Sequence, residues 1–137
     1  MEEILKLIAR VPTGRNLLER FVPLYSKKVV SLHTYPEELT RQLRALLPDG
    51  QTIGASWMEN ERVIYLDTEG PLGMLAPFLV HEMVHVLSNK KGTEVELDAF
   101  EIQTRFTQEL KDRDPKYQEF LLANYSRTKL TDDWLAA

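Results

Sequence analysis

Two histidines and a glutamate lie close together in an otherwise apolar stretch. Residues 76–87 read APFLVHEMVHVL, and His81, Glu82 and His85 are the polar or ionisable residues between Met74 and Leu87. A helix that is apolar nearly all round is a buried helix. Burying two imidazoles and a carboxylate costs on the order of several kcal/mol unless they find partners. The sequence therefore predicts that something inside the protein compensates these three groups.

The spacing of the three residues favours a metal ion as that partner. On a helix, His81 and His85 lie one turn apart on the same face, so both imidazoles can bind one ion. Neutral imidazole suits zinc, and Glu82 would project beside the ion without binding it, as a general base. The alternative is that both histidines pair with backbone carbonyls of the core and that Glu82 pairs with an arginine.

A catalytic zinc site takes three protein ligands and leaves one position open. The remaining histidine, His33, is far upstream, so we expect a carboxylate from the next helix. Glu94 and Glu96 project on opposite sides of that helix's apolar stripe, so only one of them can reach a given ion. We expect Glu94, because Asp98 one turn later could accept a hydrogen bond from a ligand histidine. Glu96 would complete a T-x-x-E capping box with Thr93. Glu94 could instead be a helix-start acid favoured by the helix dipole.

These two segments resemble a known family. The run from His81 to His85, followed by Glu94 to Asp98, is similar to the H-E-x-x-H plus E-x-x-x-D signature of gluzincin zinc metallopeptidases, and the small size resembles the minigluzincins. The resemblance covers about residues 51–110. It implies one zinc ion per chain bound by His81, His85 and Glu94, with Glu82 as general base and proton shuttle. Asp98 would orient a ligand histidine, and His81 is the one expected.

The resemblance also implies a peptide or protein substrate, whose peptide bonds are hydrolysed. A strand at 51–58 or 62–67 could hold an extended peptide by β-augmentation. Such sites usually contain a side chain that stabilises the oxyanion, and Tyr125, Tyr117 and Arg105 are the candidates. For each tyrosine, a place in the core or at its rim is the alternative.

The elements that must position these residues predict an α+β fold, because helices precede and follow a small group of strands. A zincin-like domain would pack a small antiparallel or mixed sheet on the active-site helix, with further helices C-terminal to it. Pro23 is expected to end the second helix, and Pro77 lies either in the first turn of its helix or at a kink. We expect helices at 2–10, 13–22, 36–47, about 71–89, 93–110, 115–125 and 131–136, and strands at 28–35, 51–58 and 62–67.

Length and composition exclude several other classes of protein. With 137 residues we expect one domain, 1–137. The formal charge of −4 argues against nucleic-acid binding. The absence of cysteine excludes a thiolate metal site, and no signal peptide or membrane span is expected. These features favour a cytoplasmic protein.

The leading hypothesis is a zinc-dependent peptidase. The alternative is a catalytically silent or latent zincin-fold module that binds or regulates a partner. In the latent case residues 1–25 or 126–137 would fill the cleft. The oligomeric state is not predicted.

Overall fold

The computed structural model describes residues 2–47, 53–67, 72–114 and 116–117. The helix expected at 115–125 lies outside these residues except for two positions, and the helix expected at 131–136 lies wholly outside them.

The described residues form five helices and a three-stranded mixed sheet, so the predicted α+β class is confirmed. In chain order the elements are α1 (Glu2–Ile8), α2 (Pro12–Ser26), β1 (Ser31–Thr34), α3 (Glu37–Ala45), β2 (Ala55–Met58), β3 (Val63–Leu66), α4 (Leu72–Leu87) and α5 (Thr93–Arg113).

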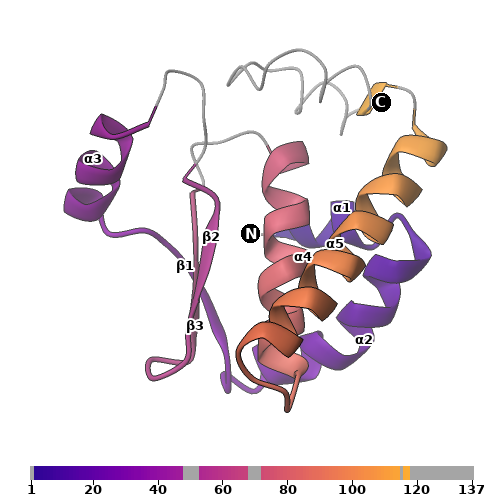
Figure 1. Cartoon of the computed structure of the whole chain (residues 1–137), viewed down its shortest axis with the longest axis horizontal. Helices are drawn as coiled ribbons and strands as arrows, with labels where there is room; N and C mark the ends of the chain where they lie inside the picture. Colours follow the sequence, from indigo (N-terminus) through magenta and orange to yellow (C-terminus); the bar gives the residue numbers. More distant parts are fainter. Residues whose placement is uncertain (1, 48–52, 68–71, 115, 118–137) are drawn as a thin grey trace.

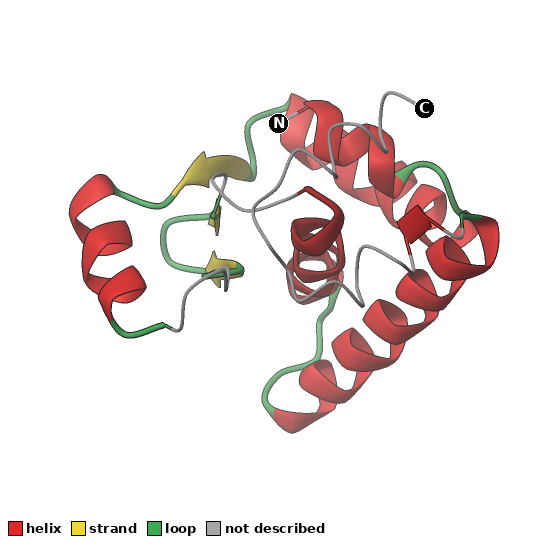
Figure 2. Ribbon diagram, turned by 90° about the horizontal axis from the view of Figure 1, so that it is seen from above, coloured by secondary structure: helices red, strands yellow, loops and turns green. Residues whose placement is uncertain are grey.

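The sheet has the strand order β1-β3-β2. The predicted hairpin is confirmed, since β2 pairs antiparallel with β3 and places Trp57 opposite Ile64. The central strand β3 also pairs parallel with β1, where Leu32 lies opposite Ile64. Strand β2 is therefore an edge strand. Figures 1 and 2 show the sheet between α3 on one side and α4 on the other.

Helix α4 lies at the centre of the molecule, as its apolar sequence predicts. It contacts β2 and β3 on one side and α1, α2 and α5 on the other (Figure 2). Leu75, Leu79, Val80 and Met83 are almost completely buried. None of the described helices combines the length and the apolar character needed to cross a membrane.

The N-terminal helices are part of this core. Ile4, Leu7 and Phe21 are almost completely buried and belong to the same cluster as the α4 side chains. Helices α1 and α2 therefore pack into the core against α4. Residues 126–137 lie outside the described residues.

Two prolines lie inside helices. The prediction that Pro23 ends the second helix is wrong, since α2 continues to Ser26. Pro77 lies beyond the first turn of α4, at its sixth residue. A proline at this position cannot donate a hydrogen bond to the carbonyl four residues earlier, that of Gly73. The Tyr117 hydroxyl donates to that carbonyl instead, at 2.8 Å.

Candidate metal centre

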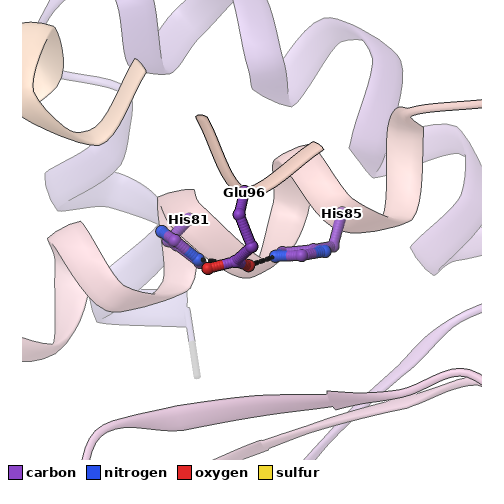
Figure 3. Close-up of side chains that lie close together, drawn as sticks. All are labelled: His81, His85 and Glu96. Carbon is purple, nitrogen blue, oxygen red and sulfur yellow. Dashed lines mark hydrogen bonds and ion pairs between the residues drawn. The ribbon is translucent and has the colours of Figure 1, made fainter. Parts of the chain in front are cut away.

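Three potential metal-binding side chains converge between α4 and α5. His81 and His85 project from one face of α4, and Glu96 reaches them from the first turns of α5 (Figure 3). The Glu96 Oε1 atom lies 3.2 Å from the His81 Nε2 atom and also pairs with the His85 Nε2 atom. The potential ligand atoms of the three residues all lie within 4.8 Å of one another.

The carboxylate in this cluster is that of Glu96, whereas the sequence had favoured Glu94. Glu94 is exposed and is not part of the cluster. The expected capping box does not form, because Gly92 is the residue before the helix and Thr93 is already the first helical residue. Glu96 is thus the fourth residue of α5, beyond the capping-box position. Its side chain is free to turn toward α4.

The neighbour of His81 also differs from the expected one. The His81 Nδ1 atom lies 2.9 Å from the Gln103 side-chain oxygen, whereas Asp98 accepts a hydrogen bond from the Lys90 ammonium group at 2.9 Å. With Nδ1 next to Gln103, the Nε2 atom of His81 is directed at the cluster. The ring of Phe100 packs edge-on against His81, with 4.6 Å between ring centroids. Gln103 thus occupies the position expected for Asp98.

Glu82 lies beside the cluster, on the side of the sheet. Burial raises the pKa of its carboxyl group above the ordinary value, and the negative charge of Glu96 adds to this rise. The two histidines lower the pKa without cancelling the effect, as does a hydrogen bond from the Trp57 backbone N–H. The bond to Trp57 places the β2 edge directly against Glu82.

Glu96 has the opposite shift. Its partial burial would raise the pKa of its carboxyl group, but the hydrogen bonds and positive charge of His81 and His85 lower it. Glu96 is therefore held in the anionic form, which is the form that binds cations.

Of the three candidates for an oxyanion-stabilising residue, the two that the structure describes do not lie at the cluster. Tyr117 is fully buried and donates to the Gly73 carbonyl, which is the core alternative for a tyrosine. Arg105 is exposed and pairs with Glu101 at 3.2 Å. Tyr125 lies outside the described residues.

Tyr35, which the sequence did not single out, is a tyrosine whose pKa is raised by burial and by the charge of Glu82. It is buried at the end of β1, and its hydroxyl lies 2.6 Å from the Ser56 hydroxyl on β2. Burial raises the pKa of Tyr35; the Ser56 hydrogen bond lowers it, and the charges of Glu82 and Asp67 raise it further. No spacing along the sequence indicates the contact of Tyr35 with Ser56, because strands that are distant in sequence bring the two residues together.

The donor set fits zinc. Two imidazole nitrogens and one carboxylate oxygen are the ligands of many catalytic zinc sites, which leave a fourth position open.

Comparison of this chain with protein-family models, with curated proteins and with solved structures finds no match.

Proposed function

We propose that this protein is a zinc-dependent peptidase with a zincin-like arrangement of its site. The observation that carries the proposal is the convergence of His81, His85 and Glu96 on one point, with Glu82 beside it on the same helix. Structural zinc sites use four protein ligands, whereas three ligands with a neighbouring carboxylate suit catalysis.

The protein's own side chains account for the proton movements of such a reaction. Zinc, when bound, supplies Lewis-acid chemistry, because it polarises a carbonyl group and makes a nearby water molecule more acidic. Glu82 accepts a proton from the attacking water and delivers it to the leaving amine as the C–N bond breaks. Burial raises the pKa of Glu82, which strengthens it as a proton acceptor for this role.

The edge of β2 supports an extended peptide as the substrate. Asp67 donates its backbone N–H to the Gly54 carbonyl. Because hydrogen-bonded pairs alternate along antiparallel strands, the backbone N–H and C=O groups of Ser56 and Met58 also point toward β3. The backbone groups of Ala55 and Trp57 then face away from the sheet, toward Glu82. A peptide strand paired with this edge would lie across the cluster.

Metal analysis tests the ligand set. Protein purified without a histidine tag and without added metal should contain about one zinc ion per chain. Glu96→Ala should lose the ion because it removes a ligand, whereas Glu94→Ala, two residues away, should keep it. Elemental analysis of the three proteins gives the answer. Zinc absent from the wild type, and not taken up from a slight excess, would contradict the proposal.

Substitution of Glu82 tests catalysis separately. Glu82→Gln should keep the zinc but lose turnover by about 10²–10⁴-fold, because the base is gone and the ligands remain. Cleavage of a pool of unrelated peptides, followed by mass spectrometry, is the measurement, with Glu94→Ala as the active control. If both Glu82→Gln and the wild type bind peptides without cleaving any, the protein is a binding module.

A further inference from the structure

A pocket of about 690 Å³ opens beside His85 and Glu96. One wall is the end of β2 with Trp57 and the turn that follows it with Arg62, and the other is the loop 88–92 between α4 and α5. The volume is that of a typical binding pocket for a small group or a side chain. Because two of the potential zinc ligands, His85 and Glu96, line the pocket, a group bound there would lie next to the candidate metal site.

The walls of this pocket carry three cations, Arg62, Lys90 and Lys91, and two anions, Glu59 and Glu96. Several of these charges are already neutralised. Lys90 pairs with Asp98, and Glu96 is directed at the histidines. No carboxylate forms an ion pair with Arg62 or Lys91 within the described part of the chain.

Arg62 is held in position by the turn and by Trp57. Its φ of 58° lies in the left-handed region, and its backbone N–H donates to the Glu59 carbonyl at 3.2 Å. Its guanidinium carbon lies 5.0 Å from the centroid of the Trp57 ring. A guanidinium that lies over an aromatic ring can still donate its in-plane N–H groups to a carboxylate. The cation is thus partly preorganised for an anion.

The opposite end of the cluster has a different character. The Phe78 ring lies near Gly54, just before β2, and Phe100 packs against His81, yet both rings are partly or largely exposed. Leu97, on α5 like Phe100, is also exposed. The cluster therefore lies between an apolar end and an end that carries Arg62, Lys91 and Glu59, where the two cations outnumber the one anion and form no ion pair among the described residues. The two sides of a bound peptide would meet different chemistry.

We infer that the pocket beside His85 binds the carboxylate of an acidic residue next to the cleaved bond. This inference rests on the proposed peptidase function, because only that function supplies a cleaved bond. A peptide antiparallel to β2 would place the acidic residue N-terminal to the cleaved bond, since β2 runs from the Phe78 end toward the Arg62 turn. A parallel peptide would place it C-terminal. In either case a glutamate or aspartate is preferred at one side only.

The experiment compares peptides that differ only by Glu, Gln or Lys at each position around the cleaved bond. The wild type should prefer Glu over Gln by about ten-fold in kcat/KM, and the preference should fall as salt is added. The double reversal of Arg62→Glu with Lys91→Glu should favour Lys instead. Lys116→Glu, a single charge reversal just beyond the C-terminal end of α5, should leave the preference unchanged. Equal cleavage of the three peptides by the wild type would overturn the inference.

Binding to the Glu82→Gln variant, measured by fluorescence anisotropy with the same peptides, separates this inference from the proposed function. A preference for Glu that the double reversal removes supports the pocket, even if the wild type cleaves nothing and the peptidase proposal fails. Cleavage with no charge preference overturns the pocket and leaves the peptidase proposal standing. If the double reversal does not fold, Arg62→Gln takes its place, and an unchanged preference in that variant counts against the pocket.

Discussion

Some residues of the candidate site are positioned by their own helix, and others by the packing of one helix against another. His81 and His85 face the same way because four residues make about one helical turn. Glu96 faces them because of how α5 is rotated against α4: this rotation turns Glu96 toward α4 and leaves Glu94 exposed to solvent. That rotation is set by the apolar residues between the two helices, Val95, Ala99 and Phe106 among them.

Gln103 provides a prediction at this scale. Gln103→Ala should weaken zinc binding by about 10–100-fold, because His81 loses the acceptor that orients its ring. The measurement is zinc competition against a chelator of known affinity. Asp98→Ala is the matched control, because Asp98 pairs with Lys90 and should leave the affinity unchanged. The opposite ranking of the two variants would show that Asp98 orients the histidine after all.

At the scale of elements, α4 continues through a proline because another segment satisfies the backbone group that the proline leaves unpaired. Pro77 cannot donate to the Gly73 carbonyl, and the Tyr117 hydroxyl does so from beyond the end of α5. The first turns of α4 and the end of α5 are thus joined by a buried hydrogen bond. This bond supports the helix that carries His81 and His85.

Tyr117→Phe should lower the free energy of unfolding by about 1–2 kcal/mol, because it leaves the Gly73 carbonyl without this donor. Urea denaturation followed by circular dichroism measures the change. In Tyr65→Phe, the lost hydrogen bond is an exposed one to Glu61, so the expected change is below about 0.5 kcal/mol. Equal losses in the two variants would mean that the Tyr117 hydroxyl has no special role in α4.

At the scale of the whole molecule, the candidate site depends on three separate parts of the chain. Helices α1 and α2 pack against α4, β2 lies against Glu82, and α5 supplies Glu96. An ion bound by His81, His85 and Glu96 would link α4 to α5 across the loop between them. Zinc binding should therefore stabilise the folded protein as a whole.

Thermal unfolding with and without zinc tests this linkage. A ligand at about 100 times its dissociation constant stabilises the native state by about 2.7 kcal/mol. For a chain of this size that corresponds to a rise in Tm of roughly 5–10 °C. Differential scanning calorimetry should show the rise in the wild type and in Glu94→Ala, and should show none in His85→Ala. A similar rise in His85→Ala would point to zinc bound elsewhere.

The sequence alone was sufficient for features that depend on neighbours along the chain. Helical periodicity predicted the buried helix α4 and placed two histidines on one of its faces, and turn residues predicted the β2–β3 hairpin. The α+β class followed from the order of these elements. Such features depend on backbone geometry within one helix or one hairpin, and the residue types of that segment specify this geometry.

The tertiary structure decided which distant side chains meet. It brought Glu96 to the histidines in place of Glu94, Gln103 to His81 in place of Asp98, and Trp57 to Glu82. It also brought the Tyr117 hydroxyl to the Gly73 carbonyl of α4. Each of these contacts depends on how one packed element is rotated and shifted against another, and that rotation is set jointly by many core side chains. A spacing along one helix carries no information about the helix or strand that packs against it.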